Sequence, residues 1–227
     1  MFCYKIDKNK KLFTFLNPYS YLLVRKEKEI FKYFNIYIDG IALVKILHLI
    51  GCKDIKRQSF DMTSLAPIVF DNAIKENKSL YFIGTKPGVI DNAIKNLQEK
   101  FPALNIVGFR NGYIKDEERE KVLQKIVDLN PDIVVCGMGT PLQERFLLDL
   151  QKKGWKGIGY TCGGFLHQTA KHIQYYPKWI DKYHLRWAYR IYDEPKLLKR
   201  YFWDYLKFLF VFIYDYLIYR LSKKIKH

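Results

Sequence analysis

Between residues 80 and 161, short apolar segments recur, and each ends at a glycine, a threonine or a polar loop. Segments of five or six residues are too short for helices and therefore predict β-strands. They cover residues 80–84, 104–109, 132–137 and 157–161. Because these strands are apolar almost throughout rather than alternating, they indicate a parallel sheet covered on both faces.

The segments between these strands have the apolar spacing of amphipathic helices, with apolar side chains three and four residues apart. The first 78 residues show a weaker pattern, which predicts further helices and a short strand at residues 35–38. The expected helices cover residues 20–34, 41–50, 62–77, 89–101, 122–129 and 146–150. The expected fold class is therefore α/β, with a Rossmann-like, mostly parallel sheet and helices on both faces.

The last quarter of the chain differs from the rest. From Lys171 it carries 13 Lys and Arg against 5 Asp and Glu, which is half of the net charge of +16. The segment 201–221 is strongly aromatic, but its longest charge-free run, 208–214, is far shorter than the roughly 20 apolar residues of a membrane-spanning helix. The pattern favours a helix lying in the membrane interface, with a core-packing or dimer helix as the alternative. We expect an α/β core over residues 1–170 and a helical, basic and aromatic appendage over residues 171–227.

The net charge of +16 indicates anionic partners, namely nucleic acid, phosphates or an acidic membrane surface. No sequence signature of an RNA- or DNA-binding module is present, so nucleic acid is the less favoured alternative. The N-terminus has no apolar stretch of the secretory type, which predicts a cytoplasmic protein. The four cysteines form no CxxC pair and are expected to be reduced and buried; they are Cys3, Cys52, Cys136 and Cys162.

Four loops, each containing glycine, follow the predicted strands. In an open parallel sheet, ligands bind beyond the carboxyl ends of the strands. Glycines let the backbone approach a ligand, and the helix N-termini that follow favour phosphate. The four loops, 84–88, 110–113, 137–144 and 162–169, therefore predict a nucleotide pocket. The binding candidates from the first three loops are Gly84, Thr85, Arg110, Gly137 and Gly139.

Several common nucleotide sites are excluded by these loops. Leu142 stands where the dinucleotide fingerprint has its third glycine, and no acidic residue follows the next strand, which argues against NAD. A GxxxxGK[ST] phosphate loop is missing, and so is an Asp-x-Asp clamp for a metal. We therefore expect neither a cofactor nor a metal, with phosphate charge met by Arg, Lys and helix ends.

Taken in order, these segments resemble the WecG/TagA/CpsF glycosyltransferase family, over residues 35–200. The matching stretches are 39–44, 82–88, 102–113, 131–144, 176–179, 185–190 and Glu194-Pro195. The resemblance implies an inverting, metal-independent transfer of an N-acetylmannosamine-type sugar or a related hexose from a UDP-sugar. The implied acceptor is a lipid-linked glycan on polyprenyl diphosphate, at the inner face of the cell membrane.

The resemblance also implies roles for single residues. Asp39 matches the proposed general base, which would take the proton from the acceptor hydroxyl; its alternative role is to cap the helix over 41–50. Gln143 and Glu144 match the Gln-Glu of the nucleotide-sugar pocket, or they are simply polar residues of a first helical turn.

Arg190 and Arg200 match two of three basic positions that are thought to contact the diphosphate. The third position is Leu197, although lysines flank it, and the alternative is a solvated basic face. Asn17 aligns with the asparagine of an N-terminal Thr-x-Asn-Pro motif, and His167 stands near the position of a family aspartate. Because both lie where sugar or acceptor recognition is expected, the transferred sugar is left open. A non-catalytic, membrane-associated scaffold that binds UDP-sugars remains an alternative, and a homo-oligomer is left open.

Overall fold

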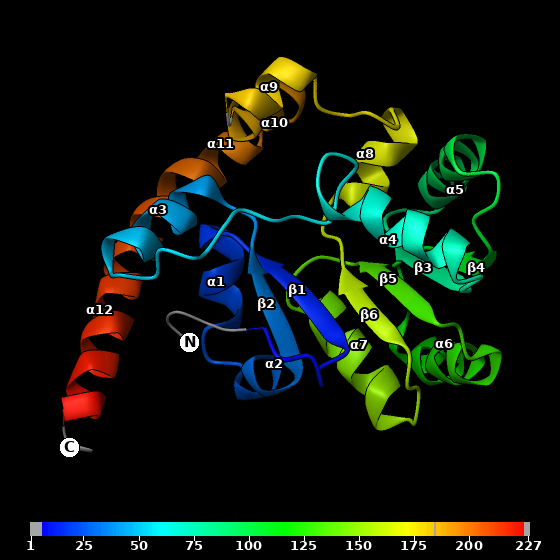
Figure 1. The fold of residues 1–227 in the computed structure, drawn as a ribbon, viewed down its shortest axis with the longest axis horizontal. Coiled ribbons are helices and arrows are strands. Elements are labelled where there is room, and N and C mark those ends of the chain that lie inside the picture. Colours follow the sequence, from blue (N-terminus) through cyan, green and yellow to red (C-terminus); the bar gives the residue numbers. More distant parts are fainter. Residues whose placement is uncertain (1–5, 184, 225–227) are drawn as a thin grey trace.

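A computed structural model describes residues 6–183 and 185–224 and has a six-stranded sheet at its centre (Figure 1). The strands are β1 (Leu12–Leu16), β2 (Phe34–Ile38), β3 (Leu80–Gly84), β4 (Ile106–Arg110), β5 (Ile133–Gly137) and β6 (Ile158–Thr161). Their order is β2-β1-β6-β5-β3-β4, and every neighbouring pair is parallel. The predicted parallel sheet is confirmed.

Helices cover both faces of the sheet, as predicted. Those of the first three quarters of the chain are α1 (Pro18–Val24), α2 (Lys28–Tyr33), α3 (Ile41–Leu49), α4 (Leu65–Lys75), α5 (Val89–Lys100), α6 (Asp116–Leu129), α7 (Leu142–Lys152) and α8 (Phe165–Lys171). Helices α1, α2, α6 and α7 pack on one face, and α4, α5 and α8 pack on the other. Strand β3 sends Tyr81 and Ile83 to the first face and Leu80 and Phe82 to the second, so both faces are apolar.

The N-terminal region departs from the expectation in two places. Strand β1 is not predicted, yet it lies between β2 and β6 in the sheet. Its central residue, Thr14, is polar and fully buried. The buried hydroxyl is satisfied because it donates to Glu144 Oε1 at 2.8 Å. The single helix expected over 20–34 is wrong: the chain turns after α1, where the Glu27 amide donates to the Val24 carbonyl at 2.8 Å, and α2 begins at Lys28.

The cysteines follow the expectation only in part. Cys136 and Cys162 are buried free thiols. Cys52 is disulfide-bonded, so the expectation of a reduced thiol is wrong there, and Cys3 lies outside the described residues. A disulfide depends on how close two Cα atoms come in space, which spacing along the chain does not reveal.

The C-terminal appendage is helical. Its elements are α9 (Lys178–Lys182), α10 (Arg186–Asp193), α11 (Leu197–Lys199), a π-helical turn η1 (Arg200–Asp204) and α12 (Tyr205–Lys224). In Figure 1, α12 runs along one edge of the molecule beside α1. Phe208 and Phe212 pack on the ring of Tyr21, and Asp215 accepts hydrogen bonds from Arg25 Nε at 2.7 Å and the Tyr21 hydroxyl at 2.8 Å.

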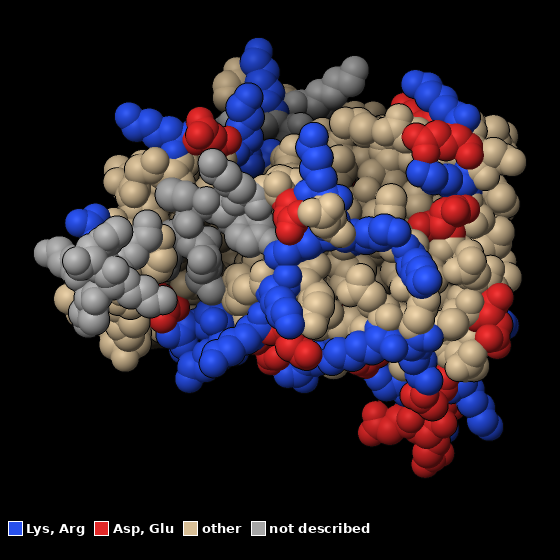
Figure 2. Space-filling model, turned by 60° about the horizontal axis from the view of Figure 1, so that its bottom comes forward, with Lys and Arg blue, Asp and Glu red and all other residues tan. Residues whose placement is uncertain are grey.

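Because these contacts hold one side of α12 against α1, its other side is exposed. We call this side the outer face of α12; with the preceding turn it comprises Phe202, Trp203, Leu206, Leu209, Phe210, Ile213, Tyr214, Leu217, Ile218 and Leu221. Within the part of the chain that the structure describes, no helix combines the length and hydropathy needed to cross a bilayer. Figure 2 shows Lys and Arg side chains spread over much of one face, so the positive charge there is not confined to a single patch.

Candidate functional site

A cleft of about 760 Å³ opens at the carboxyl ends of β1, β2 and β6. Asn17 enters it after β1, Asp39 after β2, and the backbone of 161–164 after β6. The start of α7 forms a further wall with Gly139 and Gln143, and α10 of the appendage closes over the opening. This is the edge of a parallel sheet at which ligands bind, so the cleft is the candidate active site.

Asp39 lies in this cleft and does not cap a helix. Helix α3 begins at Ile41 with Gly40 as its N-cap residue, so the carboxylate of Asp39 is not used for capping. A side chain at Gly40 would meet Pro18 and Asn17, with its Cβ 2.9 Å from Pro18 Cδ. The missing side chain therefore lets the Asp39 segment lie directly against the start of α1.

Arg57 holds Asp39 from two directions. Its Nε donates to the Asp39 carbonyl at 2.8 Å, and its Nη2 donates to Asp39 Oδ1 at 3.1 Å. Despite this cation, removal from bulk water raises the pKa of Asp39 above its usual range, with Asp61 adding to the rise. A carboxylate with a raised pKa is a stronger proton acceptor, which suits a general base.

A chain of contacts leads from Arg57 to the appendage. Arg57 also donates to the Ser59 hydroxyl at 3.0 Å, and that hydroxyl donates to Asp61 Oδ2 at 2.6 Å. Arg186 of α10 then donates from Nη1 to the same Asp61 oxygen at 2.5 Å, and from Nη2 to the Thr63 hydroxyl. The guanidinium of Arg186 is buried and its carbon lies 4.9 Å from the centre of the Tyr176 ring.

One helical turn after Arg186, Arg190 lines the cleft beside the loop that follows β6. A Cβ built on Gly164 would lie 3.4 Å from Arg190 Nη2, so a larger residue there would crowd the guanidinium. Arg190 Nε is buried and has no hydrogen-bond partner among the described residues. Because Arg190 lines the cleft, its guanidinium can meet an anionic ligand there.

Gln143 and Glu144, at the start of α7, have different surroundings and contacts. Gln143 lines the cleft, accepts from the Gly163 amide at 3.2 Å and donates to Thr140 and Glu144. Glu144 lies behind it, fully buried, and burial raises the pKa of its carboxyl. Gln143 therefore joins the loops after β5 and β6, whereas Glu144 joins α7 to β1 through Thr14.

Several predicted residues lie beside the cleft rather than in it. A side chain at Gly84 would collide with the backbone of Gly137, and one at Gly137 would lie 2.8 Å from Cys162 Sγ. The Thr85 amide donates to the Gly137 carbonyl at 3.1 Å. These residues pack the ends of β3, β5 and β6 together, and they do not line the cleft.

Two more predicted residues, Arg110 and His167, are also outside the cleft lining. Arg110, at the end of β4, donates to Glu118 at 2.8 Å. His167 is in the first turn of α8, where partial burial lowers its pKa. Arg200 begins the turn η1, but its side chain lies outside what the structure describes. Asn17 does line the cleft, and its side chain also caps α1 by accepting from the Ser20 amide at 3.0 Å.

Sequence reasoning missed Arg57, Asp61 and Arg186. The first two lie in an irregular segment before α4 that has no recognisable motif, and their partner Arg186 is 125 residues away from Asp61. The basic character of the appendage signalled a cation near the site but not which one. Among the described residues, no three His, Cys, Asp or Glu side chains are grouped to hold a metal ion.

Comparisons with known proteins give a consistent picture. A family model described as the glycosyl transferase WecG/TagA/CpsF family matches residues 3–223. The chain is 40% identical over 201 residues to UDP-Gal:alpha-D-GlcNAc-diphosphoundecaprenol beta-1,4-galactosyltransferase of Shigella boydii, covering 88% of this chain and 84% of the relative.

Two relatives from Bacillus are named for the transfer of a different sugar from that of the Shigella relative. Both are N-acetylglucosaminyldiphosphoundecaprenol N-acetyl-beta-D-mannosaminyltransferases. The protein of Bacillus spizizenii (strain ATCC 23059 / NRRL B-14472 / W23) is 30% identical over 165 residues, which is 71% of this chain and 62% of the relative. That of Bacillus subtilis (strain 168) is 29% identical over 128 residues, which is 56% of this chain and 49% of the relative.

Proposed function

The chain belongs to the WecG/TagA/CpsF glycosyltransferase family, and from this premise we propose that it transfers a hexose or an N-acetylmannosamine-type sugar from a UDP-sugar to a polyprenyl-diphosphate-linked sugar. The transfer inverts the anomeric centre and needs no metal ion. The observation that carries the proposal is the position of Asp39, a carboxylate with a raised pKa in a cleft lined by cations.

Asp39 acts as the general base in this proposal. Its carboxylate takes the proton of the acceptor hydroxyl while that oxygen bonds to the anomeric carbon of the donor sugar. At the same time the bond from the anomeric carbon to the diphosphate breaks, and UDP leaves with the electron pair. Arg57 keeps the carboxylate oriented through its two hydrogen bonds.

The leaving diphosphate is stabilised by cations and backbone amides. Arg190 and Lys196 line the cleft, and Arg190 Nε has no partner among the described residues. The glycine-containing loops after β5 and β6 lie at the beginnings of α7 and α8, where helix N-termini favour phosphate. Preorganised charges of this kind stabilise charge that develops in a transition state, which supports transfer without a metal ion.

The relatives support the choice of substrates. All three act, by their names, on a sugar-diphosphoundecaprenol acceptor, while the sugar they transfer is galactose in one and N-acetylmannosamine in two. UDP-galactose is therefore the first donor to test, followed by UDP-N-acetylmannosamine. An acceptor held in a membrane, together with the apolar outer face of α12, supports a peripheral position on the inner face of the cell membrane.

The test is UDP release from a panel of UDP-sugars, with an N-acetylglucosaminyl-diphosphate-polyprenol acceptor and EDTA present. We expect acceptor-dependent release from one donor. The Asp39→Asn variant should lose at least a hundredfold in kcat, since general-base catalysis contributes about 10²–10⁴-fold, and should still bind UDP. Asp71→Asn, at an exposed aspartate of α4, is the control.

Each result has a distinct meaning. Wild-type turnover by Asp39→Asn would exclude this residue as the base. UDP binding without release from any donor would favour the non-catalytic scaffold. Loss of release in EDTA, restored by a divalent cation, would contradict the metal-independent reaction.

A further inference from the structure

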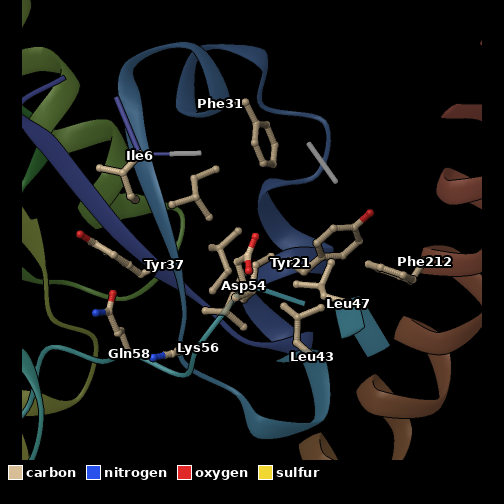
Figure 3. Close-up of a pocket in the computed structure, with 14 residues that line it drawn as sticks. Ile6, Tyr21, Phe31, Tyr37, Leu43, Leu47, Asp54, Lys56, Gln58 and Phe212 are labelled. Atoms are coloured by element: carbon tan, nitrogen blue, oxygen red, sulfur yellow. The ribbon is translucent and has the colours of Figure 1, made fainter. Parts of the chain in front are cut away.

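A second cavity, of about 370 Å³, lies between β2, α3 and α12 (Figure 3). Its inner wall is apolar and buried, and is formed by Leu16, Tyr21, Ile36, Ile38, Leu43 and Leu47. In Figure 3, Phe212 approaches from α12 on the side opposite Tyr37. The polar residues Asp54 and Lys56 are exposed, so they lie at its mouth. We call this cavity the apolar pocket.

The apolar pocket is separated from the cleft by a single layer of backbone. At five places in the chain, one residue lines the pocket and its immediate neighbour lines the cleft. The pairs are Leu16 with Asn17, Tyr21 with Ser20, Ile38 with Asp39, Leu43 with Ala42, and Gln58 with Arg57. Since consecutive Cα atoms are about 3.8 Å apart, the pocket lies directly behind the part of the cleft that holds Asp39.

This position is on the acceptor side of the reaction. The loops after β5 and β6, which supply the helix N-termini for the UDP phosphates, border the cleft and contribute no residue to the apolar pocket. Asp39, which would touch the acceptor hydroxyl, directly follows the pocket residue Ile38. The apolar part of a bound acceptor is thus expected nearer to this pocket than the uridine of the donor.

Helix α12 borders both cavities. Tyr205 lines the cleft and Phe212 lines the apolar pocket, and their separation of seven positions corresponds to about 10.5 Å along a helix. The same helix carries the exposed apolar outer face. Both cavities therefore adjoin the helix whose opposite side carries the surface that would face the membrane.

We propose that the apolar pocket receives a few isoprene units near the diphosphate end of the polyprenyl chain of the acceptor. This inference rests on the proposed function, which supplies a polyprenyl acceptor. An isoprenoid has no polar groups beyond its diphosphate, and the inner wall offers it carbon surfaces, which favours burial. A cavity of about 370 Å³ admits only a short part of a long chain, and the remainder stays in the membrane.

The experiment fills the pocket and compares two acceptors. Leu47→Trp adds a large side chain at a buried pocket position of α3, while Leu49→Trp adds the same side chain two residues further on, at a residue that is 86% exposed. Each variant is assayed with one sugar diphosphate carried either on a polyprenyl chain or on a short alkyl chain. Binding of a sugar-free polyprenyl diphosphate is measured as well.

We expect Leu47→Trp to raise KM for the polyprenyl acceptor about tenfold, the effect of keeping roughly two CH₂ groups from burial. Its KM values for the short-chain acceptor and for the UDP-sugar should stay those of the wild type. Binding of the sugar-free polyprenyl diphosphate should weaken by the same factor, and Leu49→Trp should change none of these values.

Other results would overturn the inference. If KM rises equally for both acceptors, or rises for neither, the pocket does not hold the chain. Should the wild type bind polyprenyl diphosphate but transfer no sugar, the proposed function fails while the binding comparison still decides the pocket. If Leu47→Trp does not fold, Ile55→Trp at the pocket lining, in the irregular segment between α3 and α4, replaces it with the same expected outcome.

Discussion

Two arginine–aspartate pairs join the appendage to the core. In one pair the appendage supplies the arginine, and in the other it supplies the aspartate. At the cleft the appendage supplies Arg186 and the core supplies Asp61; at α12 the appendage supplies Asp215 and the core supplies Arg25. The side chains are 10% and 12% exposed in the first pair, and 17% and 19% in the second. Both pairs are therefore largely removed from water.

The two pairs differ in what they are connected to. Asp61 and Arg186 both line the cleft, and Ser59 and Arg57 link them to Asp39. Arg25 and Asp215 line no part of the cleft and contact Tyr21 and α12 instead. The first pair thus ties the appendage to the candidate site, and the second fixes which side of α12 is exposed.

The largest effect is expected from breaking the cleft pair. Arg186→Met leaves the Asp61 carboxylate buried without its main cation, and loss of one partner of a buried pair costs about 3–5 kcal/mol. The free energy of unfolding in urea should fall by this amount, and kcat/KM should fall because Arg190, on the same helix, loses its position. Arg186→Lys should recover part of both, since it keeps the charge but not the fork of donors. An unchanged urea midpoint for Arg186→Met would contradict the role of the pair.

Breaking the α12 pair should have a smaller and different effect. Arg25→Met removes charged hydrogen bonds to Asp215 and is expected to lower the free energy of unfolding by about 1.5–3 kcal/mol. Because Arg25 does not line the cleft, KM for the UDP-sugar should stay that of the wild type. A change in donor KM similar to that of Arg186→Met would mean that the two attachments are not independent.

The pH dependence of transfer should also distinguish the two pairs, because only the cleft pair lies near Asp39. As the proposed base, Asp39 would work when deprotonated, so the rate should fall as the pH drops through its raised pKa. Asp61→Asn removes a negative neighbour that raises this pKa, so the acid limb of kcat/KM should move to lower pH. Asp215→Asn should leave the limb in place.

Other charged and titratable groups also face Asp39 and set the size of this shift. Three of these groups are cations, namely Arg57, Arg186 and Arg190, and the fourth is the hydroxyl of Tyr176. The cations lower the pKa of Asp39 and remain present in Asp61→Asn, so they act in the same direction as the substitution. An acid limb that moves to higher pH in Asp61→Asn would exclude Asp39 as the group that titrates.

The smallest effect should come from a surface pair, which sets the baseline for both attachments. Lys152 and Glu29 lie 3.1 Å apart and are 56% and 57% exposed. Lys152→Met should change the free energy of unfolding by no more than about 0.5 kcal/mol, because water and salt screen exposed pairs. A loss comparable with that of Arg25→Met would remove burial as the reason for the difference.

The sheet was predictable from the sequence where its strands are apolar on both faces. Strands β3 and β5 are completely buried, and their runs of apolar residues mark them directly. Strand β1 buries alternate residues and has a threonine at its centre, so it lacks a continuous run. Its place in the sheet depends on pairing with β6, which is more than 140 residues away.

The lining of the candidate site was predictable where the segment that lines the cleft is local. Asp39 directly follows β2, Gln143 lies six residues after the end of β5, and both line the cleft. The contact between Asp61 and Arg186 joins two segments far apart in the chain, and charged residues in polar segments usually face solvent. Such a pair becomes visible only when the appendage is placed over the core.

The single layer of backbone between the cleft and the apolar pocket has a consequence for how this enzyme can change. A substitution at one of the five places where neighbouring residues line the two cavities moves atoms that are one residue away from the other cavity, because interiors are close-packed. Under the roles proposed for Asp39 and the apolar pocket, a lineage that adapts to a bulkier membrane lipid at these places changes its acceptor geometry in the same steps. Directed evolution for a new acceptor should accordingly select mutations in coupled pairs of neighbouring positions rather than in either cavity alone.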